Sequence, residues 1–319
     1  MKKVSIVVLN WNGEEYIADC LKSLENQSYK NYEITVVDND SSDESIKIIK
    51  KFKKVKLIEH NENSGNAEGI NIGIRNSNGD YIINLDNDTK VNKDFITELV
   101  KVADKHKDCG MLASKMVFYD QPDLINSTGL DFYDDGSAVD RNIREKDKGF
   151  EEIEEVFAPC GGSALYKREA LEGIKKLEGD YFDQDFKFYY EDADVAFRIR
   201  HLGYKCFYVP KAVTYHKVNA STKKVKDLRV YYGVRNKIFF LIKNYPIKVL
   251  IKSLPKILIK QILSTIYYLF QGKLVVLKAR WDAIVGLRNM LKKRKKIDPS
   301  NSKLNFPFKK NSLFNLFFN

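Results

Sequence analysis

The 319-residue sequence has few cysteines, few histidines and no long apolar run. Its four cysteines, Cys20, Cys109, Cys160 and Cys206, are far apart and form no CxxC pair. This argues against a zinc site or a disulfide framework and favours reduced thiols. The longest uncharged stretch in the C-terminal part, residues 261–272, has 12 residues, whereas about 20 are needed to span a bilayer. We therefore expect no membrane-spanning helix.

The N-terminal segment also lacks the apolar stretch of a signal peptide. In MKKVSIVVLNWNG, two lysines precede only six apolar-leaning residues before Asn10. This pattern predicts a first β-strand and a chain that stays in the cytoplasm.

Acidic residues are scarce in the last third of the chain. From Lys217 onward there are 24 lysines and arginines against Asp227, Asp282 and Asp298, a net charge of +21, whereas residues 1–216 carry a net charge of −10. Such asymmetry predicts a polyanionic partner for the basic part, either nucleic acid or an anionic membrane.

Residues 238–319 are rich in leucine, isoleucine and lysine. Lys248, Lys252, Lys256 and Lys260 recur every four residues, which places them along one side of a helix. Two interpretations fit: helices lying in a membrane interface, or a helical cap on the rest of the protein with a solvated lysine face. We expect the first, a basic amphipathic tail that associates with an anionic membrane.

Residues 1–110 alternate strand-like and helix-like segments, which predicts an α/β fold with a parallel, doubly wound sheet flanked by helices. The helices are expected at 15–26, 44–52 and 69–76. The predicted strands are Val4–Leu9, Glu33–Val37, Val55–Glu59 and Tyr81–Leu85.

Polar residues follow three of these strands: Asn10, Asp38 and Asp86. Ligands of such sheets bind beyond the carboxyl ends of the strands. We therefore expect the three side chains to converge on one crevice.

Residues 111–216 are less regular. Asp134-Asp135-Gly136 predicts the turn of a β-hairpin. A helix is expected over 189–201, and a strand over Lys205–Val209 that ends at Pro210.

Asp86-Asn87-Asp88 is the first motif that points to chemistry. Two carboxylates two residues apart in a tight loop can share Mg²⁺ or Mn²⁺, because such ions prefer oxygen ligands. The same residues also form Asx turns without any metal. The position at a strand's carboxyl end favours the metal site.

Glu191-Asp192 is the second, and it follows Phe188, Tyr189 and Tyr190. Acids at a helix start are often explained by capping and the helix dipole. Here, however, the aromatic side chains can raise a carboxyl pKa towards the range of a general base.

His216 and Gly161-Gly162 are weaker signals. A histidine after a strand is either a structural residue or a further metal ligand. The glycines either admit a sugar or phosphate close to the backbone or form a tight turn.

Together these residues resemble the family-2 glycosyltransferases with the GT-A fold. The sequences of the motifs are most similar to those of the rhamnosyltransferase-like branch. The resemblance runs from about Val4 to His216. It rests on an ordered set of motifs: Val7–Gly13, Val36–Asp43, Asn63–Asn71, Leu85–Thr89, Cys160–Ser163, Glu191-Asp192 and His216.

The resemblance implies a GT-A domain with a Rossmann-like, mostly parallel sheet. Residues 1–110 would bind the nucleotide sugar and 111–237 the acceptor. Residues 238–319 lie outside the resemblance, and their composition predicts a C-terminal helical appendage, the tail. The implied nucleotide-sugar-binding residues are Leu9, Asn10, Asp38, Asn63, Gly65, Asn71, Asp86 and Gly162.

It also implies the reaction. Asp88, Asp86 and His216 would hold Mg²⁺ or Mn²⁺, and Asp192, beside Glu191, would be the general base. The reaction would be inverting transfer from a nucleotide-diphosphate sugar to a hydroxyl of a glycan or of a polyprenyl-diphosphate-linked acceptor. The expected process is surface polysaccharide synthesis at the inner face of the cell membrane.

The sequence departs from the family pattern at Asn66 and Glu68, where relatives have an apolar and a small residue. This leaves the donor open. Three alternatives also remain: a sugar nucleotidyltransferase, which would usually begin with a glycine- and arginine-rich loop, a non-catalytic sugar- or nucleotide-binding protein, and a nucleic-acid-binding protein. We expect no nucleic acid partner, because the acidic body would repel phosphate.

Overall fold

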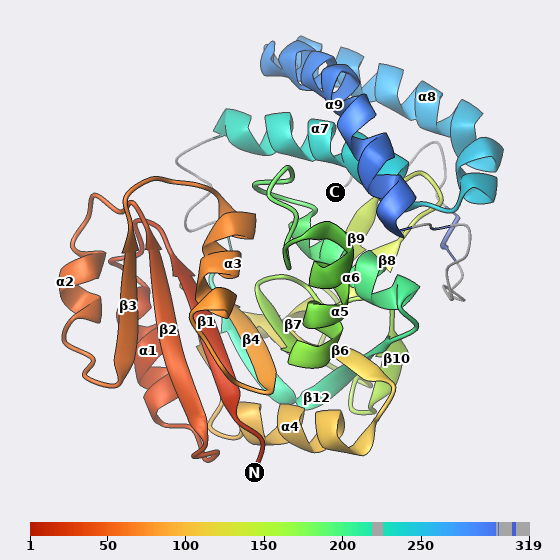
Figure 1. The fold of residues 1–319 in the computed structure, drawn as a ribbon. Helices are drawn as coiled ribbons and strands as arrows, with labels where there is room; N and C mark the ends of the chain where they lie inside the picture. Colours follow the sequence, from red (N-terminus) through yellow and green to blue (C-terminus); the bar gives the residue numbers. More distant parts are fainter. Residues whose placement is uncertain (219–225, 298, 300–307, 311–319) are drawn as a thin grey trace.

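The computed structural model describes residues 1–218, 226–297, 299 and 308–310. Within them one ten-stranded sheet runs through the molecule, in the order β10-β12-β6-β11-β4-β1-β2-β3, with β5 and β7 paired to β12 and β6. Helices cover both faces of this sheet, and α7, α8 and α9 lie together at one end (Figure 1).

The first half of the sheet is parallel, as predicted. Strands β3, β2, β1 and β4 pair in parallel in that order, with helices between them. The elements are β1 (Val4–Asn10), α1 (Ile17–Glu25), β2 (Tyr32–Asn39), α2 (Ser45–Ile49), β3 (Val55–His60), α3 (Asn66–Arg75) and β4 (Tyr81–Asp86). The alternation of residues 1–110 is confirmed, with α3 beginning three residues before the predicted position.

The second half of the sheet is mixed. β11 is antiparallel to both β4 and β6, while β12 is parallel to β6. Its elements are β5 (Thr89–Val91), α4 (Phe95–Lys105), β6 (Cys109–Phe118), β7 (Gln121–Ser127), β8 (Leu130–Phe132), β9 (Ala138–Asp140), β10 (Glu154–Val156), β11 (Ser163–Lys167), α5 (Arg168–Glu178), α6 (Glu191–His201) and β12 (Lys205–His216). The predicted hairpin is confirmed as β8–β9, joined through Gly136 at φ +80°.

The prediction that Pro210 ends a strand is wrong. β12 continues to His216, and its pairing with β6 shifts register between Val209 and Val213. A bulge of this kind tolerates proline, because the missing N–H falls where the ladder is already interrupted. The continuation matters because it carries His216 to the carboxyl end of the sheet.

Three long helices complete the described chain: α7 (Lys226–Asn244), α8 (Ile247–Phe270) and α9 (Val275–Ile297). α7 packs against α6 and α9, and α9 also contacts α5 and α8. None of the helices in the described residues is both long enough and apolar enough to cross a bilayer.

The expected lysine face of α8 is only partly confirmed. Lys248 and Lys252 are exposed, whereas Lys256 pairs with Asp134 and the buried Lys260 pairs with Asp135 at 2.7 Å. A step of four residues advances about 40° around an α-helix, so the four lysines wind around α8. Its inner lysines meet the acidic turn between β8 and β9.

Candidate active site

A cavity of about 920 Å³ opens at the carboxyl ends of β1 and β4 and at the end of β12, a volume typical of ligand sites. The cavity also reaches the start of α7, through Leu228 and Arg229. Of the predicted site residues, five line it: Leu9, Asn63, Asp86, Asp88 and His216.

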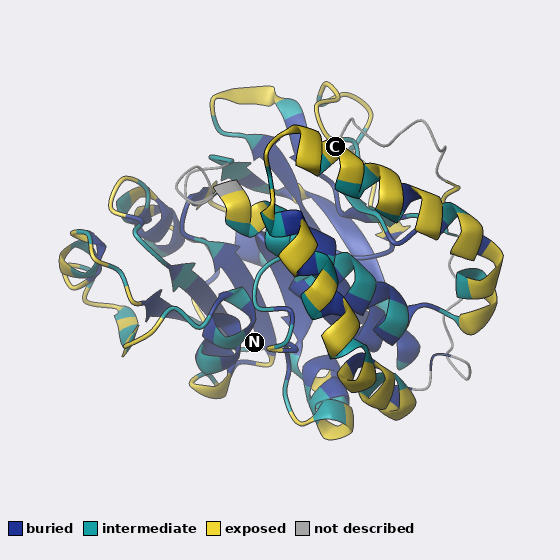
Figure 2. Ribbon diagram, turned by 90° about the horizontal axis from the view of Figure 1, so that it is seen from above, coloured by how far each residue is buried: buried dark blue, intermediate teal, exposed yellow. Residues whose placement is uncertain are grey.

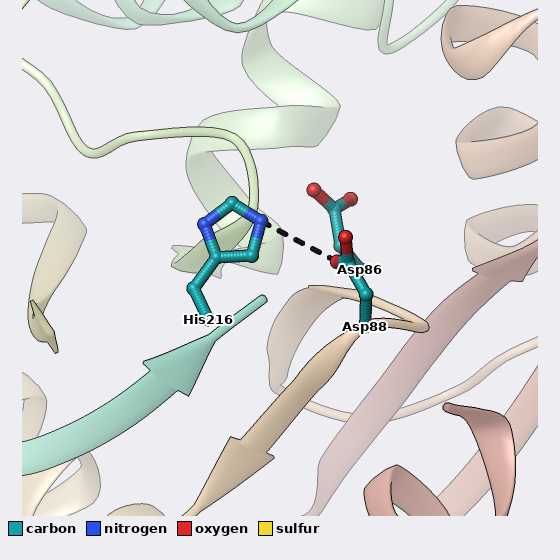
Figure 3. Close-up of side chains that lie close together, drawn as sticks. All are labelled: Asp86, Asp88 and His216. Atoms are coloured by element: carbon teal, nitrogen blue, oxygen red, sulfur yellow. Dashed lines mark ion pairs between the residues drawn. The ribbon is translucent and has the colours of Figure 1, made fainter. Parts of the chain in front are cut away.

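Asp86, Asp88 and His216 come together in this cavity although they lie on different strands or loops. Their potential ligand atoms all lie within 4.8 Å of one another. His216 at the tip of β12 faces Asp88, with 3.4 Å between Nε2 and Oδ1, and the carboxylate of Asp86 lies beside them (Figure 3). The backbone N–H of Lys217 donates to the carbonyl oxygen of Asp88 over 3.0 Å, which ties the two segments.

The electrostatics of this group are those of crowded buried acids. Burial and the negative charge of Asp88 raise the pKa of Asp86 to about 6. Burial lowers the pKa of His216, but its ion pair with Asp88 and the charge of Asp86 outweigh this, so the pKa is raised. The group therefore favours a bound cation.

Asn126 orients His216, and sequence reasoning missed it. His216 Nδ1 lies 2.8 Å from the amide oxygen Oδ1 of Asn126, which leaves Nε2 directed at Asp88. Partners of this kind fix the ring orientation of metal-binding histidines. Asn126 is in β7, far from the motifs along the chain, and no local pattern distinguishes it from other polar strand residues.

Asp192 lies next to the cavity, at the start of α6. Its two carboxylate oxygens accept hydrogen bonds from the backbone N–H groups of Gly161 (3.0 Å) and Ala193 (2.7 Å). Burial raises its pKa, although these two bonds oppose the shift. A Cβ on Gly161 would lie 3.0 Å from the Cβ of Asp192, so this glycine permits the close approach.

Glu191 is buried beside Asp192. Burial and the charge of Asp192 raise the pKa of Glu191 to about 8. Asn66 Nδ2 donates to Glu191 Oε1 over 3.1 Å, while Oε2 has no hydrogen-bond partner among the described residues. Asn66, one of the two departures from the family pattern, thus contacts Glu191 directly.

The segment before this pair has an unusual backbone. Lys187, Tyr189 and Tyr190 all have positive φ, from +56° to +68°, a conformation that costs free energy in residues other than glycine. The buried Asn236 of α7 holds the segment, because its Nδ2 lies 2.6–2.8 Å from the carbonyl oxygens of Phe186, Phe188 and Tyr189.

Of the three strand-end side chains expected to converge on one crevice, only Asp86 lines the cavity, whereas Asn10 and Asp38 do not. The buried Asp38 accepts a hydrogen bond from Asn10 Nδ2 (2.7 Å) and from Ser41. Asn10 Oδ1 in turn accepts from Asn87 Nδ2 over 2.8 Å. This chain of bonds connects the ends of β1, β2 and β4 beneath the cavity wall, so the roles of Asn10 and Asp38 at the nucleotide stay predictions.

Gly65, Asn71 and Gly162 also lie behind the wall. Asn71 bonds to the backbone of Phe182 in both directions, each over 2.8 Å. A Cβ on Gly65 would lie 2.3 Å from Lys187, and one on Gly162 would lie 2.9 Å from Asp86 Oδ2. Both glycines allow close packing of segments that form the cavity.

Several residues that line the cavity were not predicted. They include Trp11 after β1, Asp140 at the end of β9, and the basic side chains Arg144, Lys217 and Arg229. Apart from Trp11, they come from the less regular half of the chain and from α7, where sequence periodicity indicates elements but not their mutual placement.

A sheet with a parallel first half, a mixed second half and a cavity of paired acids at its carboxyl edge is the GT-A arrangement. The family model of glycosyl transferase family 2 matches residues 5–175, more than half of the chain. The chain belongs to this family.

Individual relatives agree. The chain is 26% identical over 189 residues to the glycosyltransferase GlyG of Streptococcus pneumoniae serotype 4, covering 57% of this chain and 62% of GlyG, so it spans less than two thirds of that relative. It is 25% identical over 242 residues to the amylovoran biosynthesis glycosyltransferase AmsB of Erwinia amylovora, covering 72% of this chain and 75% of AmsB.

Among solved structures, the mannosyltransferase PcManGT of Pyrobaculum calidifontis, in complex with GDP-Man and Mn²⁺, has the same fold. Its TM-score is 0.56 at 16% identity, with 94% of this chain and 86% of PcManGT covered. Family-2 membership and the GT-A fold thus agree, and one relative of the chain, AmsB, is named for polysaccharide biosynthesis.

Proposed function

We propose that this protein is a metal-dependent, inverting glycosyltransferase. It would transfer a sugar from a nucleotide-diphosphate donor to a hydroxyl of a glycan or of a polyprenyl-diphosphate-linked acceptor, in surface polysaccharide synthesis. The observation that carries the proposal is the meeting of Asp86, Asp88 and His216 in one cavity with Asp192 beside it.

The donor class is supported by the family and by the GDP-Man bound to PcManGT. Membership of a glycosyltransferase family favours sugar transfer over the nucleotidyltransferase alternative. Rhamnosyl transfer is our first candidate, and AmsB, named for amylovoran biosynthesis, supports an acceptor in polysaccharide assembly.

The residues present fit Mg²⁺ or Mn²⁺. Two carboxylates and one imidazole offer oxygen and nitrogen atoms within a common radius, and Asn126 fixes the histidine with Nε2 turned towards them. Such a cation, when bound, would offset the negative charge that develops on the departing diphosphate. In this proposal Asp88 and His216 hold it most directly, and Asp86 is shared with the ribose and diphosphate.

Asp192 would act on the acceptor. Its carboxylate takes the proton of the acceptor hydroxyl as that oxygen forms a bond to the anomeric carbon. The bond from the same carbon to the diphosphate breaks on the opposite face, and its electron pair leaves with the diphosphate. A single displacement of this kind inverts the anomeric configuration. The high pKa of Glu191 keeps a second charge away from this base near neutral pH.

The remaining predicted residues would shape the donor side. Leu9 and Asn63 line the cavity, while Asn10, Asp38, Gly65, Asn71 and Gly162 would hold its walls. We further propose that residues 1–110 bind the donor, 111–237 the acceptor, and that the tail of residues 238–319 keeps the enzyme at the inner face of the cell membrane.

The proposal is tested by a panel of nucleotide sugars, including dTDP-rhamnose, UDP-GlcNAc and GDP-mannose, with and without Mn²⁺. We expect at least one donor to raise the melting temperature and to be hydrolysed slowly, only with the cation. Asp88→Asn should abolish this cation-dependent response to the donor. Asp19→Asn, an exposed surface control, should respond as the wild type does. Cation-independent turnover, or no response to any donor, would contradict the proposal.

A further inference from the structure

The exposed large apolar side chains of the described residues are concentrated on the C-terminal helices. Of 21 such side chains, 17 lie between Ile247 and Leu291, and only four lie elsewhere. Soluble monomers rarely expose large contiguous apolar surface, and where they do it marks an interaction site. Figure 2 shows the exposed faces of these helices extending across the top of the molecule.

The exposed side chains form a stripe along α8. Ile251, Leu254, Leu258, Ile262 and Ile266 are all exposed, the first to 66% and Ile262 to 60%. Their spacing of three or four residues places them on one face of the helix. The opposite side of α8 contacts the body through Ser253, Ile257 and Lys260.

α9 continues this surface. Leu277, Trp281 and Ile284 are exposed, Trp281 to 65%, at the same helical spacing, while Val276, Ala279 and Ala283 are buried. We call the outward side chains of α8 and α9 the apolar face.

Charge identifies the occupant of the apolar face. Between residues 247 and 297 the only acid is Asp282, and its carboxylate accepts a hydrogen bond from Tyr231 of α7. The exposed charges around the apolar face are therefore basic: Lys248, Lys252, Lys278, Arg288, Lys292, Lys295 and Lys296.

From this combination we propose that the apolar face of α8 and α9 inserts into the surface of an anionic lipid bilayer, with its basic rim at the lipid headgroups. A symmetric dimer through the same face is disfavoured, since it would bring two basic rims together. This deepens the membrane location in the proposed function, because it makes apolar insertion the main contact.

The position of α7 relates this surface to the cavity. Leu228 and Arg229, in the first turn of α7, line the cavity, and α9 packs along α7. A bilayer on the apolar face would therefore lie one helix layer away from a wall of the cavity.

Vesicle binding by the full-length protein tests the proposal. We expect it to sediment with phosphatidylcholine vesicles that contain phosphatidylglycerol, and to remain partly bound at high salt. Leu258→Asp/Ile262→Asp should weaken binding by about tenfold or more, because two charged side chains replace inserted apolar ones. The matched control is Ile153→Asp/Leu177→Asp, which changes two exposed apolar residues outside the apolar face and should bind as wild type.

Trp281 supplies a second, local measurement. The chain has two tryptophans, so Trp11→Phe leaves Trp281 as the sole reporter. Its emission should shift to the blue with anionic vesicles. The substitutions of exposed residues should leave the melting temperature unchanged. A variant that misfolds would therefore be recognised by a lower melting temperature.

Three outcomes would overturn the proposal: no sedimentation of the wild type, equal binding by the α8 double variant, or a wild-type dimer that becomes a non-binding monomer in that variant. These outcomes are independent of the proposed catalysis. If the Leu258→Asp/Ile262→Asp variant no longer binds vesicles but still hydrolyses the donor, the membrane-insertion proposal is supported independently of the catalytic one. If Asp88→Asn and the wild type behave alike, only the catalytic proposal fails.

Discussion

The body of the protein and its C-terminal helices place their charged and apolar side chains in opposite ways. Residues 1–216 are acidic, bury their apolar side chains around the sheet and direct carboxylates into a cavity. The helices α7 to α9 are basic, direct part of their lysines inward and leave apolar side chains outside.

The contact between the two regions explains why their side chains are arranged in opposite ways. Lys243 of α7 lies 2.6–2.9 Å from carboxylate oxygens of Glu178, Asp183 and Asp194, and Lys293 of α9 also pairs with Asp183. The basic side chains of the helices thus serve as counter-charges for the acids of the body. Those acids do not mark a second catalytic site, although their spacing alone would permit a metal.

The largest effect should come from a change confined to the body. Asp192→Asn removes the proposed proton acceptor and should lower turnover by about 10²–10⁴-fold. Donor affinity and vesicle binding should stay as in the wild type, which separates the chemistry from the helices. Turnover within about tenfold of the wild type would refute the assignment of the base.

Lys243→Met would break the junction between the regions. It leaves three buried carboxylates without their shared cation and should cost about 3–5 kcal/mol of unfolding free energy, measured by denaturant titration. Lys248→Met, at an exposed site of α8, is the control and should be close to neutral. Equal stability of the two variants would show that the helices dock by other contacts.

Asn236→Ala tests whether the helices also serve the chemistry. Without this amide the backbone before Glu191 loses its donor, and the start of α6 should shift. Because small displacements of catalytic groups are costly, we expect kcat to fall by about 10–100-fold, with donor KM little changed. Asn289→Ala on α9 removes only a surface contact to Asp185 and should leave kcat intact. Similar kcat values in both variants would contradict the role.

A change in pH dependence is also expected. Folding raises the pKa of Glu191 from 4.5 to about 8, so the folded state retains a proton that the unfolded state releases above pH 4.5. The associated stability is complete below that pH and is lost as the pH rises through about 8. Glu191→Gln should therefore gain melting temperature relative to the wild type between these values, by about 2–4 °C for each kcal/mol. A constant difference across this range would contradict the shift.

Sequence predicted the body better than the junction. Local periodicity and strand-end polarity were sufficient for β1 to β4 and for placing Asp86 and Asp88 at the sheet edge, since parallel strands bring their ends to one edge. His216 was a weak signal by itself, and only the family resemblance gave it a role as a metal ligand. The sequence was misleading at Pro210, where pairing with β6 continues β12 past a bulge. The spacing of the lysines in α8 predicted a helix, but not that Lys260 would meet Asp135, because that contact joins residues far apart in the chain.

The three carboxylates around Lys243 have one more consequence, which concerns chelation. An ammonium attached to the chain occupies the place between three carboxylates that a dissolved ion could fill. A chelator such as EDTA cannot remove it. The docking of α7 is therefore independent of the supply of divalent ions. Metal depletion should abolish the proposed sugar transfer in the cavity while the protein stays folded.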